Sequence, residues 1–348
     1  MSIELNSIME ELYGKTIAIV YIFEGEDAAG FQHYHIWRGD VISGWLGAIQ
    51  SLHCLPLIFD VRTFVEKAVN RTLPHIDYVL NLNCGSCELS SMGLVPSTCS
   101  FLGLPCIPCK TGSIITGEDK YIANLIAQAR GLTVPKELPP NDHSGIYRPL
   151  NFGSSVGVKR GVCPAPYRDG TYQEFIPGFD ITTPVVYNPI HQAMELMPSV
   201  AILPDTPVPE WFYGENENIT HAGIKRQIIP PFQKKLAEKY LDVVRAFSIS
   251  TFCRIDARIK CNDVAQINHF LTSSAALEDV FFLEINPMPS IRETENDFLY
   301  SFNNICDGSI KDYIQRMESV LGKVTLNTFL LVSSMLSYIT ATCKKQMD

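Results

Sequence analysis

The segment 281–289 constrains the fold of this chain most, because it is mostly apolar and yet carries polar groups in a fixed pattern. Its sequence, Phe-Phe-Leu-Glu-Ile-Asn-Pro-Met-Pro, predicts a buried β-strand. Side chains on a strand alternate between its faces, so Glu284 and Asn286 share one face and Ile285 lies on the other. Buried polar groups need partners, and a hard divalent cation such as Mg²⁺ prefers oxygen ligands of this kind.

The upstream segment 251–258 repeats the pattern, since Arg254 and Asp256 also lie two positions apart. We expect the two strands to pair as a hairpin that presents one cation and three metal ligands, namely Arg254, Asp256, Glu284 and Asn286. The alternative is that both are ordinary amphipathic strands with their polar residues in solvent. The apolar neighbours Ile255 and Ile285 make this alternative the weaker one.

Length and charge restrict the class of protein. The chain has 348 residues, of which 46% are hydrophobic and 19% charged, so we expect a globular protein of two or three domains. A net charge of −9 argues against nucleic acid or an anionic membrane as the main partner. The N-terminus shows no basic region followed by an apolar stretch, so we expect no secretory signal and a cytoplasmic location. The apolar segment 326–341 is shorter than the roughly 20 residues of a membrane span, which predicts a buried or interface helix.

Four of the eleven cysteines have the spacing of a zinc site. Cys84 and Cys87 form one C-x-x-C pair, and Cys106 and Cys109 form a second pair further along the chain. The alternative is that they are reduced, buried thiols without a metal, as is common in cytoplasmic proteins. Spacing alone favours zinc, and both interpretations stay open.

The first third of the chain alternates between apolar strand-like and helix-like segments. The segments 15–23, 56–60 and 78–83 predict strands, and 41–52 predicts a helix. This order is typical of a parallel α/β sheet, whose ligands lie at the carboxyl ends of the strands. Two loops follow such ends: an acidic turn that contains Glu26, and the loop 83–88.

The order of these motifs resembles that of ATP-grasp ligases, in particular the D-alanine–D-alanine ligase group. Arg-x-Asp at 254–256 followed by Glu-Ile-Asn-x-x-Pro at 284–289 is similar to their C-terminal signature, and further matches extend upstream to Tyr78. The resemblance implies an α/β ATP-grasp fold with ATP between its last two domains. We expect an N-terminal α/β domain, a small central domain and a C-terminal catalytic domain with a helical tail, at 1–118, 119–185 and 186–348.

The central domain is expected to be trimmed, because the segment 159–173 contains Pro164 and Pro166 and leaves little room for the family's helix. The glycine-rich loop 153–157 would cover the ATP phosphates, since glycine lets backbone N–H groups approach anionic oxygens. Arg148 stands where the family has lysine. The resemblance implies nucleotide contacts from Lys120, Arg148, Gly153, Ser154, Ser155, Gly157, the adenine hinge Gln173, Glu174, Phe175 and Ile176, the ribose acceptor Asp180, and Lys225.

Departures from the family pattern fall in the pocket for the amino-acid substrates. Asn83 stands where the family has histidine, and Glu88 is kept but is followed by Leu89. After Pro289 the family has glycine and then serine, whereas this chain has Ser290 out of register and then Arg292, which is suited to bind a carboxylate. Glu26 is either a further pocket residue or part of a solvated loop. The catalytic candidates are Arg254, Glu88 and Ser290.

The resemblance implies an ATP-dependent carboxylate–amine ligase that forms an acyl phosphate, which an amine then attacks. Two Mg²⁺ ions, with Mn²⁺ as an alternative, would bind between Asp256 and Glu284 and between Glu284 and Asn286, and Arg254 would stabilise the transferring phosphoryl group. We expect amino-acid-like substrates and a homodimer, with no nucleic-acid or membrane partner. The alternatives are a D-alanine–D-alanine ligase, a degenerate nucleotide- or zinc-binding protein on this scaffold, and a kinase that stops at the acyl phosphate.

Overall fold

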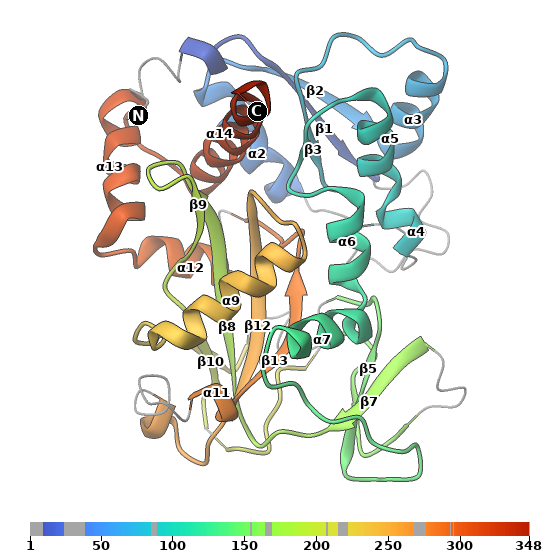
Figure 1. Ribbon diagram of the computed structural model, residues 1–348, viewed down its shortest axis with the longest axis vertical. Coiled ribbons are helices and arrows are strands. Elements are labelled where there is room, and N and C mark those ends of the chain that lie inside the picture. The colour runs from blue at the N-terminus through green and yellow to red at the C-terminus, as the bar shows by residue number, and fades with distance from the viewer. Residues whose placement is uncertain are drawn as a thin grey trace.

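A computed structural model describes residues 10–23, 39–84, 89–153, 155–163, 169–206, 208–214, 222–267, 276–292, 294 and 296–347. The described chain contains three β-sheets, which Figure 1 shows with the N-terminal sheet at the top, the largest sheet in the middle and the smallest at the lower right. Six residues named above, Glu26, Cys87, Glu88, Ser154, Pro164 and Pro166, lie outside the described residues.

The N-terminal sheet has the predicted parallel arrangement. Its order is β2-β1-β3-β4, formed by Leu55–Asp60, Thr16–Tyr21, Tyr78–Asn81 and Cys106–Ile107. Alternation along β1 divides the core: Ile17 and Ile19 pack with helices α2 (Gly39–Ser51) and α14 (Leu326–Met347), while Ala18 and Val20 pack with α3 (Val61–Val69) and α5 (Leu94–Leu102). Both faces are therefore covered, which explains why the strands are apolar throughout.

Short helices connect this sheet to the rest of the molecule. They are α4 (Leu89–Met92), α6 (Thr111–Glu118) and α7 (Lys120–Ala129). Asp119 begins α7 as its N-cap, because its side chain accepts a hydrogen bond of 2.9 Å from the backbone N–H of Ile122. This cap fixes Lys120 as the first residue of the helix.

The smallest sheet is antiparallel in the order β6-β5-β7, formed by Lys159–Arg160, Gly145–Pro149 and Gly170–Glu174. Its glycine-rich connection needs glycine at position 157, where φ is +72°. A Cβ at Gly157 would also lie 3.0 Å from the side chain of Pro149. The loop therefore turns tightly against the strand that carries Arg148.

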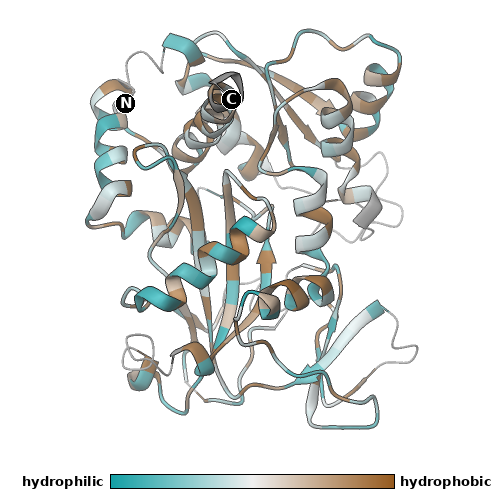
Figure 2. Ribbon diagram, in the orientation of Figure 1, coloured by the Kyte–Doolittle hydropathy of each residue, from teal (hydrophilic) through white to brown (hydrophobic). Residues whose placement is uncertain are grey.

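The largest sheet is antiparallel in the order β11-β10-β8-β12-β13, and β9 also pairs with β8. Along the chain these strands are β8 (Gly178–Asn188), β9 (Ala193–Leu196), β10 (Val200–Pro204), β11 (Ile224–Ile228), β12 (Phe252–Lys260) and β13 (Val280–Asn286). Helix α9 (Lys234–Ala246) covers one face and buries Leu236, Tyr240, Val243 and Val244 against the sheet. In Figure 1 α9 crosses in front of β8 and β12, and in Figure 2 its outward residues are mainly teal.

The C-terminal part is helical, with α11 (Ala276–Asp279), α12 (Asp297–Asn303), α13 (Gly308–Leu321) and α14. The window 326–343 of α14 is long and apolar enough to cross a membrane, but 67% of it is buried inside the protein. Helix α14 packs on α2 and is the buried helix that was predicted, although it is longer than the predicted segment. The domain limits at 118 and 185 stay a prediction.

Candidate active site

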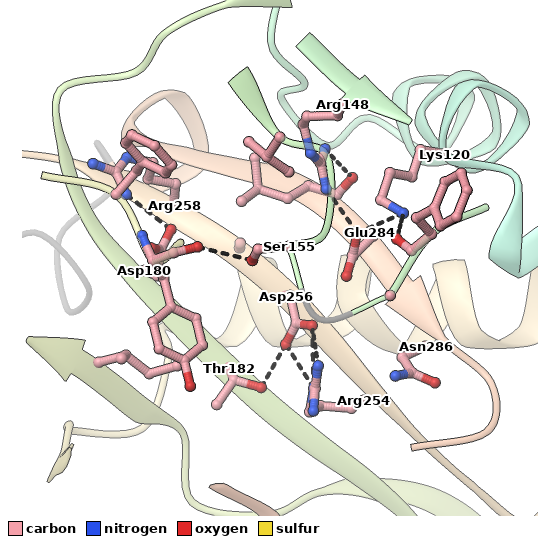
Figure 3. Close-up of a pocket in the computed structure, with 18 of the residues that line it drawn as sticks. Lys120, Arg148, Ser155, Asp180, Thr182, Arg254, Asp256, Arg258, Glu284 and Asn286 are labelled. Carbon is pink, nitrogen blue, oxygen red and sulfur yellow. Dashed lines mark hydrogen bonds and ion pairs between the residues drawn. The ribbon is translucent and has the colours of Figure 1, made fainter. Parts of the chain in front are cut away.

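A cavity of about 310 Å³ lies between the small sheet, helices α6 and α7, and the face of the large sheet opposite α9. Figure 3 shows side chains from these elements converging on it. It is lined by most of the predicted site residues, namely Lys120, Arg148, Gly153, Ser155, Gln173, Glu174, Phe175, Ile176, Asp180, Arg254, Asp256, Glu284, Asn286 and Ser290. Residues far apart in the sequence therefore form one site.

The predicted hairpin of β12 and β13 forms the floor of the cavity. Arg254 lies opposite Asn286 and Asp256 opposite Glu284, after which a β-bulge shifts the register. The intervening Ile255 is fully buried on the other face of the sheet, in the core beneath α9. Strand alternation thus separates the polar floor from the apolar core, as the sequence predicted.

Arg254 and Asp256 form a bidentate ion pair. Arg254 Nε lies 2.9 Å from Asp256 Oδ1, and its Nη2 lies 2.7 Å from Oδ2. The hydroxyl of Thr182, on the neighbouring strand β8, donates to Asp256 Oδ1 at 2.6 Å. Burial raises the pKa of Asp256, and the charge of Glu284 acts in the same direction, against the lowering by Arg254 and Thr182.

Glu284 is the carboxylate on which the cations of the site converge. Its Oε2 lies 2.7 Å from Arg148 Nη2 and 3.4 Å from Lys120 Nζ. Burial by itself would raise the pKa of Glu284, but Lys120, Arg148 and Arg254 together lower it to about 2. Glu284 is therefore ionised at neutral pH, beside two positive side chains that face the same cavity (Figure 3).

Both cations are held in place by backbone carbonyls. Arg148 Nη1 donates to Leu283 O at 3.0 Å, and Lys120 Nζ donates to Phe152 O at 2.9 Å. The contact with Phe152 connects the first residue of α7 to the residue just before the glycine-rich loop. This places the positive charges between the loop and the carboxylates, where an anionic phosphate chain would bind.

The oxygen ligands of the floor fit Mg²⁺ by their chemistry. Asp256 and Glu284 face each other across paired strands, and Asn286 adds an amide oxygen on the same face. In the part of the chain that the structure describes, no group of three or more His, Cys, Asp or Glu residues could hold a metal by itself. A Mg²⁺ ion here would therefore take its remaining ligands from phosphate and water, which is its usual mode of binding.

The far wall of the cavity is formed by the predicted hinge and by Asp180. Gln173 is buried, and Glu174 Oε1 accepts a hydrogen bond of 3.0 Å from the backbone N–H of Lys136. Asp180 Oδ1 accepts a hydrogen bond of 2.9 Å from Nη1 of Arg258, a buried residue that was not predicted. Arg258 continues the alternation of Arg254 and Asp256, so this pattern could have revealed it.

The structure does not bring Lys225 and Gly157 to the cavity lining. Lys225 is exposed and lies 3.4 Å from the carboxylate of Asp205. Its neighbour Arg226 points to the opposite face of β11 and donates from Nε to Asp297, a cavity-lining residue, at 2.7 Å. The predicted residue Lys225 thus faces outward, whereas its neighbour Arg226 contacts a residue of the cavity lining.

The end of the cavity beyond β13 carries the residues that depart from the family pattern. Ser290 and Arg292 both line it. Among the described residues, the buried hydroxyl of Ser290 has no hydrogen-bond partner. Asn83 is buried outside the lining, where its side chain donates to Ser91 O at 2.8 Å and fixes α4 at the end of β3.

Glu118, at the end of α6, is a second cavity residue that was not predicted. Burial raises its pKa to about 7; Lys120 and Arg254 act against this shift, and Glu284 adds to it. A signal was present in the sequence, because Glu118 lies two positions before Lys120. A carboxyl group whose pKa lies near neutral pH therefore lies in the cavity together with Lys120 and Arg254.

Of the four cysteines with the spacing of a zinc site, Cys106 and Cys109 are buried and Cys84 is half-buried. Cys109 is buried and its thiol donates to Pro287 O at 3.0 Å. Burial raises the pKa of Cys109, and a hydrogen bond with Cys99 together with burial raises that of Cys106. Both shifts favour the thiol over the thiolate. Cys84 lines the same cavity as Asp256, Glu284 and Asn286, and zinc binding stays an alternative.

The fold is that of ATP-grasp ligases, as the resemblance implied. The D-alanine–D-alanine ligase of Bacillus anthracis complexed with ATP superposes with a TM-score of 0.60 and 15% sequence identity, covering 95% of this chain and 99% of the ligase. A second structure of this ligase gives a TM-score of 0.62 at 13% identity, with the same coverage.

The VanG D-Ala:D-Ser ligase of Enterococcus faecalis gives a TM-score of 0.58 and 15% identity, over 93% of this chain and 99% of that enzyme. No family model and no curated relative matches the sequence. At such low identity the likeness establishes the fold, and function has to be argued from the site.

Proposed function

We propose that this protein is an ATP-dependent carboxylate–amine ligase that acts on amino-acid-like substrates. The observation that carries the proposal is the arrangement around Glu284. Two cations, Lys120 and Arg148, contact this carboxylate from one side, and Asp256 faces it across the hairpin. Such an arrangement suits phosphoryl transfer, which depends on positioning and on stabilisation of charge more than on a protein nucleophile.

The reaction would proceed in two steps. A carboxylate oxygen of the first substrate attacks the γ-phosphorus of ATP, the bond to the β-phosphate oxygen breaks, and ADP leaves. The amine nitrogen of the second substrate then attacks the acyl carbon, phosphate leaves, and the nitrogen loses a proton. The products are an amide, ADP and phosphate.

Each side chain of the site has a role in these two reaction steps. Lys120 and Arg148 would hold the phosphates beneath the glycine-rich loop. Lys120 already donates a hydrogen bond to the carbonyl of Phe152, the residue just before this loop. Arg254, held by Asp256, would stabilise the charge of the transferring phosphoryl group and of the tetrahedral oxyanion. Asp256, Glu284 and Asn286 would hold two Mg²⁺ ions, which neutralise charge on the phosphate oxygens.

The proposed substrates follow from the fold and from the departures at the far end of the cavity. The structural neighbours are named as ligases of D-alanine with D-alanine or D-serine. Here Ser290 and Arg292 line the end beyond the metal ligands, which supports a different acceptor that carries a carboxylate. A D-alanine–D-alanine ligase is the second candidate, because the likeness extends over nearly the whole length of that enzyme. The homodimer and the cytoplasmic location stay predictions.

A catalytically degenerate binding protein on this scaffold is the third candidate, from a different class. It is favoured by the bonds that already engage Asp256 and Glu284 with arginine and lysine, since a metal would have to compete for these oxygens. The two carboxylates nevertheless face one cavity, and maintaining buried charge without a function is costly.

The test is release of ADP from Mg-ATP across a panel of amino acids, offered singly and in pairs, with the product mass measured by mass spectrometry. ADP that forms only with a carboxylate and an amine, together with a product one water lighter than their sum, supports the ligase. ADP that forms with a carboxylate that carries no amine, or with one amino acid but without a product one water lighter than two molecules of it, indicates a kinase that stops at the acyl phosphate. Binding of Mg-ATP without turnover on any pair would indicate the degenerate protein.

A further inference from the structure

Arg258 connects three segments of the cavity wall through a single guanidinium group. Its Nε donates to Ile176 O at 2.6 Å, and its Nη2 donates to Gly178 O at 2.7 Å. Nη2 also donates to the carbonyls of Pro209 and Trp211, and Nη1 donates to Asp180. The residue is only 4% exposed, so these bonds are shielded from water.

The segment 208–214 lies over this guanidinium and supplies Phe212 and Tyr213 to the cavity lining. Besides Arg258, several bonds fix this cover segment. The N–H of Tyr213 donates to Asp180 Oδ2 at 3.2 Å, and Tyr213 O accepts from the hydroxyl of Ser155 at 2.8 Å. The glycine-rich loop, the cover segment and Asp180 are thus bonded in series, and Figure 3 shows Arg258, Asp180 and Ser155 close together on one side of the cavity.

The described part of the cover segment is not a strand or a helix, so it lacks the ladder of backbone bonds that holds the large sheet. Arg258, by contrast, lies on β12, directly opposite Asp180 of β8. The guanidinium therefore anchors the cover segment to the large sheet by hydrogen bonds. Its planar fork suits this task, because one group can donate to several carbonyls in fixed directions, which a lysine ammonium cannot reproduce.

Loss of the guanidinium would leave the Asp180 carboxylate and the carbonyls of Ile176 and Gly178 without their buried donor. Buried acceptors without donors are costly, so the hinge and the cover segment would rearrange toward water. The phosphate-binding cations Lys120 and Arg148 have their own contacts with Glu284 and would stay in place.

From this network we infer that Arg258 is a positioning residue, which holds the wall formed by Ile176, Asp180 and the cover segment in the shape that receives a nucleotide. The inference rests on the proposed function, because it assigns this wall to the base and ribose of ATP. Arg258 acts through the wall and not on the reacting atoms. Its removal should therefore weaken nucleotide binding much more than it slows the chemical step.

The experiment compares Arg258→Met, Arg258→Lys and Ser301→Ala with the wild-type protein. The rate of ADP release is measured against the concentration of Mg-ATP at saturating substrate pair, to separate KM from kcat. For Arg258→Met we expect KM for Mg-ATP to rise by about 10-fold or more while kcat changes by less than about 3-fold. Arg258→Lys keeps the charge but not the planar fork of donors, so its KM for Mg-ATP should lie between those of the wild type and Arg258→Met.

Ser301→Ala is the control for a loss of stability alone. Ser301 is fully buried on α12, donates to Pro198 O at 2.6 Å and does not line the cavity. This variant should unfold at a lower temperature with an unchanged KM for Mg-ATP. Limited proteolysis without nucleotide gives a second measurement, because cleavage within the cover segment 208–214 should be faster in Arg258→Met than in the wild type and Ser301→Ala.

The outcomes separate the inference from the proposed function. An active wild-type protein whose Arg258→Met variant keeps the same KM would overturn the inference and leave the proposed function intact. If Arg258→Met does not fold, Arg258→Lys decides, and a wild-type KM in that variant overturns the inference. A wild-type protein that neither binds nor hydrolyses Mg-ATP would overturn the proposed function, and the inference with it.

Discussion

The charged centre of the cavity is carried by paired strands, whereas the end beyond β13 is carried by the loop that contains Ser290 and Arg292. At the centre every named side chain has a bonded partner, and Asp256 and Glu284 are held by cations at 2.7 Å. At the loop end the hydroxyl of Ser290 is buried without a partner among the described residues. A preorganised centre suits a fixed chemical step, and unsatisfied groups at the other end suit a ligand that supplies the missing bonds.

The sharpest test of the centre is Glu284→Gln, which keeps the size of the side chain and removes the charge that Lys120 and Arg148 contact. We expect ADP release to fall by about 10²- to 10³-fold, because charge stabilisation of this kind contributes that much to catalysis. Glu66→Gln, on the exposed face of α3, is the matched control and should be as active as the wild type. Retention of activity in Glu284→Gln would show that the centre is not where the chemistry occurs.

The loop end is tested by Arg292→Met, which removes the cation next to Ser290. If this end binds the acceptor, KM for the acceptor should rise by about 10-fold or more, because one charged hydrogen bond is lost. KM for Mg-ATP should stay constant. Steady-state kinetics with each substrate varied in turn measures both constants. An equal increase in both KM values would mean that the charged centre and the loop end of the cavity do not act independently.

A smaller effect is expected from Glu118→Gln, measured as stability against pH without nucleotide. The pKa of Glu118 is raised from 4.5 to about 7, so between these values the folded state binds more protons than the unfolded state. The wild type therefore loses stability as pH rises through this window, and the variant does not.

Between pH 5 and pH 8, the free energy of unfolding of Glu118→Gln, measured in urea, should rise relative to that of the wild type by on the order of 1 kcal/mol. Glu66→Gln again serves as the control, since its side chain is exposed. If the difference in unfolding free energy between Glu118→Gln and the wild type were the same at both pH values, Glu118 would not be held protonated by burial at the centre.

The smallest effect is expected from Lys225→Ala. Because Lys225 is 69% exposed and points away from the cavity, ADP release should stay within about 2-fold of the wild type, as for most surface substitutions. The partner variant Arg226→Met removes the buried pair with Asp297 and should lower the unfolding temperature clearly. A large loss of activity in Lys225→Ala would instead restore the predicted role of this lysine at the nucleotide.

The predictions from sequence succeeded where they rested on the two-residue alternation of side chains along a β-strand. Alternation along 251–258 and 281–289 placed Arg254, Asp256, Glu284 and Asn286 on one face, and the hairpin has this arrangement. The same rule, extended by one step, would have found Arg258. Lys225 was proposed from the resemblance to the family, which gives no strand register, so nothing in the sequence indicated that Arg226 lies on the inward side of β11.

By itself, the sequence determined the strands at 15–23, 56–60, 78–83, 251–258 and 281–289 and the common face of Arg254, Asp256, Glu284 and Asn286, because local periodicity follows from backbone geometry. Only the tertiary structure decided which of these faces meet. Arg148 reaches Glu284 across 136 residues of chain, and Lys120 reaches it from the start of a helix capped by Asp119. Such contacts depend on how separate sheets pack against each other, and the sequence carries no short-range pattern that records this packing.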